Sequence, residues 1–161
     1  MAVYGASFLA LILLALPAGA AAVDRVIPAW QPALPVWGRW AGGAVFVAAL
    51  VTYLWSAAIL SGRGRGGYVE FDPPRELVTS GPFARCRNPV AGCVVLMLLG
   101  LALALSSTTL LLVVVAALPI AHAQVVLLEE PLLRARFGEA FERHCATTPR
   151  WIPWPRRGRG A

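Results

Sequence analysis

Residues 89–128 read PVAGCVVLMLLGLALALSSTTLLLVVVAALPIAHAQVVLL and contain no Asp, Glu, Arg or Lys. Two apolar runs lie in this stretch, Pro89–Leu105 and Leu110–Leu128. Each has about the 17–25 residues that a helix needs to cross the hydrocarbon core of a membrane. Because lipid offers the backbone no hydrogen-bond partners, each run is predicted to be a helix. The short, uncharged connection Ser106–Thr109 predicts that the two helices form an antiparallel hairpin.

Two earlier apolar runs, Val3–Val23 and Ala41–Leu60, are also free of charged residues. A soluble domain of 161 residues with 58% apolar residues would leave too much of its apolar surface exposed to water. The four runs therefore predict one all-α domain, a polytopic membrane protein with four transmembrane helices. The end of the first run, residues 17–22, also resembles a signal-peptide cleavage region. Since no positive residues precede it, a retained span is favoured.

The arginines orient the predicted spans. The net charge of +6 comes from fourteen arginines without any lysine. The connections after the first and third runs carry two arginines and none, whereas the middle loop and the C-terminal segment carry five and seven. The positive-inside rule places the last two segments in the cytoplasm. Arginines between apolar runs suit anionic lipid head groups better than nucleic acid. The absence of lysine and the richness in Ala, Gly, Arg and Pro favour a GC-rich bacterial genome, so the predicted location is the bacterial inner membrane.

The C-terminal region is predicted to lie on the inner membrane surface. Apolar residues recur there at helical spacing, and Pro131 suits a first helical position. We expect an amphipathic interfacial helix over residues 131–145 and a flexible tail over residues 155–161. The three cysteines are too few and too scattered for a disulfide framework or a metal site, so we expect free thiols and no metal.

Glu129 and Glu130 stand together where the fourth run ends. Adjacent carboxylates repel each other, and partial burial is costly without a cation nearby. Arg134 lies one helical turn after Glu130 and is predicted to pair with it. His122 precedes Glu129 by seven residues, which places both on nearly the same helix face. The alternatives are a helix-end charge cluster for the two carboxylates and a structural role for the histidine.

Arg87 and Asn88 directly precede Pro89, where a helix can begin without the missing amide. Free amides and the helix dipole favour an anion at that position. The alternative is that Arg87 only sets the membrane topology. The hairpin brings this segment and the Glu129–Glu130 pair to the same membrane face. A cationic and an anionic pole on one cleft would suit a zwitterion.

A series of short motifs then resembles a known family. The motifs are Leu77-Val78-Thr79-Ser80-Gly81-Pro82-Phe83, Arg87-Asn88-Pro89, Glu129-Glu130-Pro131, Arg136-Phe137-Gly138 and Pro149-Arg150-Trp151-Ile152-Pro153. In this order, over residues 75–153, they resemble the isoprenylcysteine carboxyl methyltransferase family, whose wider group includes phospholipid N-methyltransferases. The resemblance implies an integral membrane methyltransferase that uses S-adenosylmethionine and a lipophilic acceptor.

The resemblance also implies a set of site residues. The Arg87-Asn88-Pro89 segment and the two glutamates would contact the cofactor. Our hypothesis assigns Arg87 and Asn88 to the cofactor carboxylate and the two glutamates to its amino group or ribose hydroxyls. His122 would orient groups or accept a proton. Ala91 stands where the family commonly has an aromatic residue, which opens space there. The implied catalytic residues are Arg87, His122 and Glu130, and the implied cofactor-binding residues are Arg87, Asn88, Pro89, Ala91, His122, Glu129, Glu130 and Arg134.

Other functions stay open at this point. A non-catalytic membrane protein or assembly factor would use the charges for topology alone. A reductase would need a nucleotide-binding site, and no glycine-rich loop follows a predicted strand. For a methyltransferase, the acceptor could be a prenylated cysteine carboxylate, a phospholipid amine, a thiol or a small isoprenoid acid.

Overall fold

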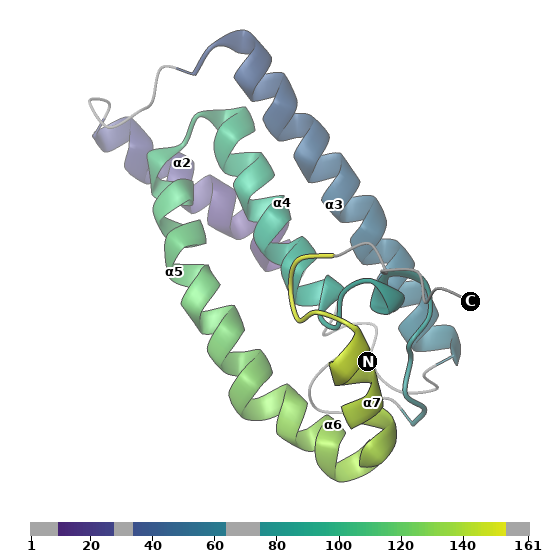
Figure 1. Ribbon diagram of the computed structural model, residues 1–161. Coiled ribbons are helices and arrows are strands. Elements are labelled where there is room, and N and C mark those ends of the chain that lie inside the picture. The colour runs from purple at the N-terminus through teal and green to yellow at the C-terminus, as the bar shows by residue number, and fades with distance from the viewer. Residues whose placement is uncertain (1–9, 28–33, 64–74, 154–161) are drawn as a thin grey trace. The chain divides into compact units, whose positions relative to one another are not determined.

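The computed structural model describes residues 10–27, 34–63 and 75–153, and every regular element in these ranges is a helix (Figure 1). A π turn, η1 (Leu11–Ala15), leads into α2 (Leu16–Val26), and α3 (Val36–Arg63) follows. The later elements are the 3-10 turn η3 (Gly81–Ala84), α4 (Pro89–Leu105), α5 (Thr108–Gln124), the π turn η4 (Val125–Glu129), α6 (Glu130–Phe137) and α7 (Glu139–Thr147). The all-α prediction is confirmed for the described residues.

Within the part of the chain that the structure describes, two helices are long and apolar enough to cross a membrane. They are Val36–Gly62, with a mean hydropathy of 2.0, and Thr108–Phe137, with a mean hydropathy of 2.4. The predicted third span, Pro89–Leu105, is an apolar helix with those bounds but is shorter. Of the predicted first span, residues 3–9 lie outside the described residues, and the rest is helical. The prediction of four transmembrane helices is therefore confirmed only in part.

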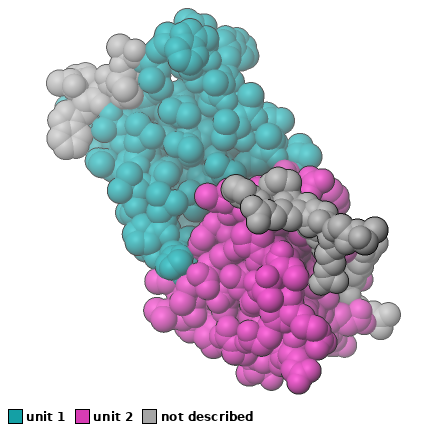
Figure 2. All heavy atoms as spheres, viewed as in Figure 1, with its two compact units in different colours: residues 1–51, 93–122 teal, residues 52–92, 123–161 magenta. Residues whose placement is uncertain are grey.

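The chain divides into two compact units (Figure 2). Unit 1 comprises residues 1–51 and 93–122, and unit 2 comprises residues 52–92 and 123–161. In unit 1, α4 and α5 run antiparallel, as predicted from the connection between them (Figure 1). The turn is tight because Ser106 adopts a φ of 53° and the Ser107 amide donates to the Ala102 carbonyl at 2.9 Å.

Side chains from the first helical segment fill the core of unit 1 against this hairpin. Two buried clusters do so, Ile12 with Leu98 and Val114, and Ala20 with Ala102 and Leu110. A buried carboxylate adds a polar contact at the turn. Asp24 accepts hydrogen bonds from the hydroxyls of Ser107 and Thr109 and from the Thr109 amide, so it caps the start of α5.

The backbones of α3 and α4 touch in unit 1 at two glycines. A Cβ atom on Gly42 would lie 2.6 Å from the Ala104 amide nitrogen, and one on Gly100 would lie 2.6 Å from the Phe46 amide nitrogen. Small residues allow such close approach between apolar helices, where dispersion contacts rather than water exclusion stabilise the pair. Glycine is therefore required at both positions.

The predicted single helix over residues 131–145 is wrong. Gly138 ends α6 with a φ of 50° and a ψ of −126°, a conformation that residues with a Cβ rarely adopt. The chain therefore reverses, and α7 begins at Glu139 and extends to Thr147. Phe141 on α7 is 2% exposed, so the second helix buries its apolar face within unit 2. The predicted flexible tail, residues 155–161, lies outside the described residues.

Candidate functional site

The start of α4 is fixed by hydrogen bonds on both sides of Pro89. The Gly92 amide donates to the Asn88 carbonyl at 3.1 Å, so the first helical turn closes directly after Asn88. The preceding Arg87 amide donates to the Pro149 carbonyl at 2.9 Å. Asn88 and Pro89 are buried. The helix start predicted at Pro89 is confirmed. The backbone at Arg87 is fixed by its own hydrogen bond to Pro149 and by the helix that begins directly after Asn88.

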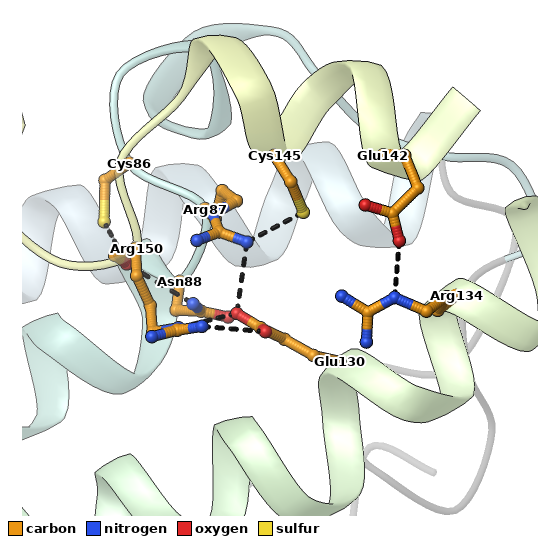
Figure 3. A network of polar contacts seen from close by, with 8 residues as sticks. All are labelled: Cys86, Arg87, Asn88, Glu130, Arg134, Glu142, Cys145 and Arg150. Atoms are coloured by element: carbon orange, nitrogen blue, oxygen red, sulfur yellow. Dashed lines mark hydrogen bonds and ion pairs between the residues drawn. The ribbon is translucent and has the colours of Figure 1, made fainter. Parts of the chain in front are cut away.

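Glu130 is the centre of a charged cluster in unit 2 (Figure 3). Arg150 donates to it through two nitrogens, from Nε to Oε1 at 2.7 Å and from Nη2 to Oε2 at 2.9 Å. Arg87 Nη1 lies 3.2 Å from Oε1. The Glu130 side chain is only 6% exposed, and a buried carboxylate requires such partners. Two guanidinium groups share one carboxylate, so the cluster carries an excess positive charge.

The Arg87 guanidinium makes one further contact beside the ion pair and has one buried nitrogen without a partner among the described residues. Its Nη1 also donates to the Cys145 Sγ at 2.7 Å (Figure 3). Its Nε is buried and has no hydrogen-bond partner among the described residues. Buried N–H groups are almost always paired in proteins. The unpaired Nε therefore marks a position where a bound acceptor atom would complete the hydrogen bonding.

The segment that carries Arg150 is tied to the loop before α4. The Cys86 Sγ lies 3.3 and 3.1 Å from the carbonyl oxygens of Arg150 and Trp151, so its single thiol proton is shared between them. The Asn88 amide Nδ2 donates to the Arg150 carbonyl at 3.3 Å. Burial raises the pKa of the Cys86 thiol, so the sulfur keeps its proton as a donor. The hydrogen bonds to Glu130 raise the pKa of Arg150 above its already high value.

Three of the predicted site residues meet in this cluster: Arg87, Asn88 and Glu130 (Figure 3). Ala91 lies in the first turn of α4 and is half-buried. Arg134 does not form the close ion pair with Glu130 that the spacing allowed, and it acts on Glu130 only through a charge interaction at longer range. Arg134 pairs instead with Glu142 on α7, since the reversal at Gly138 brings α7 back alongside α6. The Glu130 oxygens are already engaged by the two other arginines.

The remaining predicted residues have different environments. Glu129 is half-buried at the end of η4, whereas its neighbour Glu130 is buried. His122 is exposed and belongs to unit 1. The π turn η4 separates it from Glu129 and interrupts the 3.6-residue spacing on which the predicted shared face depends. The role of His122 therefore stays a prediction.

Two residues of the cluster, Arg150 and Cys145, had no predicted role. Arg150 stands in a segment with proline on either side, Pro149 and Pro153, which restricts the backbone and was a usable signal. Cys145 follows the apolar spacing of α7, and nothing in the sequence pattern separates it from a packing residue.

Comparison with known sequences places the chain in a family. Residues 37–140 match the phospholipid methyltransferase family. The chain belongs to this family. The resemblance to the wider group of membrane methyltransferases is thereby confirmed, and membership supports a membrane methyltransferase. The match includes Arg87, Asn88 and Glu130 and ends before Cys145 and Arg150.

Two curated relatives of this phospholipid methyltransferase family member are named for metal resistance. They are the nickel-cobalt-cadmium resistance protein NccN of Alcaligenes xylosoxydans xylosoxydans and the cobalt-zinc-cadmium resistance protein CzcN of Cupriavidus metallidurans. Each is 32% identical over 105 residues, which is 65% of this chain and 45% or 44% of the relative. The chain thus spans less than half the length of the relatives that it matches. No solved structure matches it significantly.

Proposed function

We propose that this chain is an integral membrane methyltransferase that transfers a methyl group from S-adenosylmethionine to a lipophilic acceptor. The family match supports the reaction class. The observation that carries the cofactor assignment is the cluster of Arg87 and Arg150 around the buried Glu130, with its unpaired Arg87 Nε. When bound, S-adenosylmethionine supplies a methyl group already activated on a sulfonium. The protein then chiefly has to align the reactants and exclude water.

The donor and acceptor groups of the cluster fit the amino-acid end of this cofactor, which carries a carboxylate and an ammonium group. The excess positive charge and the free Arg87 Nε favour the carboxylate. A carboxylate such as Glu130 has about four lone-pair sites, and the two arginines make three close contacts with it. An acceptor position therefore remains for an ammonium proton.

The residues of the cluster take complementary roles in this proposal. Arg87, together with Asn88 at the start of α4, holds the carboxylate. Glu130 receives the amino group, and Glu129 receives either that group or a ribose hydroxyl. Ala91 leaves space in the first turn of α4. The pair Arg134–Glu142 instead joins α6 to α7.

A lipophilic acceptor would reach such a protein through the bilayer. The helix Thr108–Phe137 exposes large apolar side chains along its length, among them Leu112, Val115 and Leu118. A helix with this surface is expected to face lipid. The family match favours a phospholipid amine as the first acceptor to test. The arginine counts favour a cytoplasmic position for the charged cluster.

The test compares two glutamates in purified protein. Glu130→Gln keeps the shape of the side chain and removes its charge, whereas Glu139→Gln changes a glutamate whose side chain is 94% exposed. Calorimetry in detergent should show S-adenosylmethionine binding to the wild type and to the Glu139 variant. The Glu130 variant should bind at least about tenfold more weakly, because a hydrogen bond to a charged group contributes about 1.5–3 kcal/mol.

The acceptor is tested with a radiolabelled methyl donor and membranes that contain the protein. We expect label in the lipid extract. A wild-type protein that binds no S-adenosylmethionine would refute the proposal and favour a non-catalytic membrane protein. Label confined to water-soluble products would refute the lipophilic acceptor.

A further inference from the structure

Arg150 makes the most direct contact with Glu130, although it lies beyond the part of the chain that matches the family. Its two parallel hydrogen bonds fix both oxygens of the carboxylate, a geometry that only the planar guanidinium group provides. Arg87 contributes one nitrogen at a longer distance, 3.2 Å. The orientation of the Glu130 carboxylate is therefore set mainly by Arg150.

The backbone of Arg150 is held as firmly as its side chain. Its carbonyl accepts hydrogen bonds from the Cys86 thiol and the Asn88 side chain. The carbonyls on either side of it, from Pro149 and Trp151, accept from the Arg87 amide and the Cys86 thiol. We call the segment Pro149–Trp151 the clasp. It joins the loop that carries Arg87 and Asn88 to the helix that carries Glu130.

We propose that Arg150 is a positioning residue of the cofactor site, which aims the Glu130 carboxylate at the ammonium group of the cofactor and leaves Arg87 Nε free for its carboxylate. This rests on the proposed function. It also assigns to the clasp a function rather than a packing role alone. Because the Arg150 side chain is 31% exposed and Glu130 only 6%, the arginine closes the site from its more exposed side.

If Arg150 positions Glu130, changing Arg150 should weaken the binding of only those ligands that retain the amino-acid end of the cofactor. S-adenosylhomocysteine carries the amino-acid end, whereas 5′-methylthioadenosine has the same nucleoside and thioether without it. Arg150→Gln should weaken binding of S-adenosylhomocysteine by about 10–100-fold, the range for a lost hydrogen bond to a charged group. Binding of 5′-methylthioadenosine should change less than about threefold, because this ligand lacks the groups that Glu130 and Arg87 would contact. A residue with a structural role alone would affect both ligands alike.

Two further variants control for folding. Arg143→Gln removes an exposed arginine that pairs only with Glu139 among its described ion pairs, and it should bind both ligands as the wild type does. Arg150→Lys keeps the charge but cannot donate in parallel, so its S-adenosylhomocysteine affinity should fall between those of the wild type and Arg150→Gln. If the Gln variant does not fold, the ratio of the two affinities in the Lys variant decides.

The outcomes separate this inference from the proposed function. If the wild type binds neither ligand, the proposed function fails. If it binds S-adenosylhomocysteine and the Arg150 variants keep the wild-type ratio of affinities, the positioning role is overturned while the function stands. Equal loss of both ligands would also overturn it, since Arg150 would then only support the fold.

Discussion

The adjacent glycines of α3 offer a stringent test of how the helices of unit 1 pack. A Cβ atom on Gly42 would lie 2.6 Å from the Ala104 nitrogen, 2.7 Å from the Leu103 Cβ and 2.8 Å from the Gly100 oxygen. A Cβ atom on Gly43 would meet no described atom outside its own stretch of helix within 4 Å. Both positions are inside a helix, where alanine is favoured over glycine by about 0.8–1.0 kcal/mol. Comparing the two alanine variants therefore cancels the helix propensity and isolates the clash.

The size of the clash follows from the distances. Ordinary van der Waals contact of a Cβ begins at 3.4 Å, so the Gly42 methyl would be short of it by roughly 0.6–0.8 Å. Two of the three atoms in the way belong to the α4 backbone, which cannot turn aside as a side chain can. Overpacking of this kind typically costs about 1–3 kcal/mol. We expect Gly42→Ala to be less stable than Gly43→Ala by about that amount.

Thermal unfolding in one detergent, followed by circular dichroism, measures the difference. For a chain of this size about 1 kcal/mol shifts the midpoint by roughly 2–4 °C, so the two variants should unfold about 2–12 °C apart. Gly43→Ala should unfold at or above the wild-type temperature. Equal midpoints for the two variants, or a lower midpoint for Gly43→Ala, would refute the close approach of α3 and α4.

Three further predictions concern single residues. Asp24→Asn should destabilise the protein by about 1–3 kcal/mol, because the hydroxyls and the amide that it pairs lose a charged acceptor; an unchanged denaturation midpoint would contradict this. Gly138→Ala should cost about 1–3 kcal/mol from backbone strain alone, since no described atom beyond the adjacent residues lies within 4 Å of the added Cβ. A melting curve that overlays the wild type would count against the reversal. Iodoacetamide at pH 8 should modify half-buried Cys145 before Cys86, because burial raises the pKa of the Cys86 thiol and lowers its thiolate fraction; mass spectrometry that finds Cys86 modified first would disprove the arrangement.

Much of the helical framework was predictable because charge and proline mark its ends. The run Pro89–Leu105 was predicted with the bounds that the structure shows, since a proline begins it and a Ser-Thr turn ends it. The helix break at Gly138 was not predictable from periodicity. Phe137 and Phe141 keep the four-residue spacing of one continuous helix across the glycine. The two π turns were not predictable either, because a uniformly apolar run has no polar face whose spacing would show a change in the helical repeat.

The site residues that stand at the ends of the two hairpin helices were predictable from the sequence. The residue that comes back to the site from a later segment, Arg150, was not. Arg87, Asn88 and Glu130 could be grouped because each stands at the end of an apolar run. The partner of Glu130 could not be predicted from local spacing. Arg134 is four residues away, yet the bidentate contact comes from Arg150, twenty residues away. Spacing identifies which residues can pair along one helix, but it says nothing of a partner that reaches the site through a chain reversal.

That reversal connects the fold of unit 2 to its chemistry. Because Gly138 turns the chain, α7 runs back alongside α6, and Cys145 on α7 reaches Arg87. The residues after α7 then continue into the clasp, where Arg150 meets Glu130. A straight helix over residues 131–145 would extend about 22 Å away from Glu130, at 1.5 Å per residue. Neither contact could then form, and Glu130 would lose its bidentate partner. The positive φ of one glycine is thus the local feature on which the charged cluster depends.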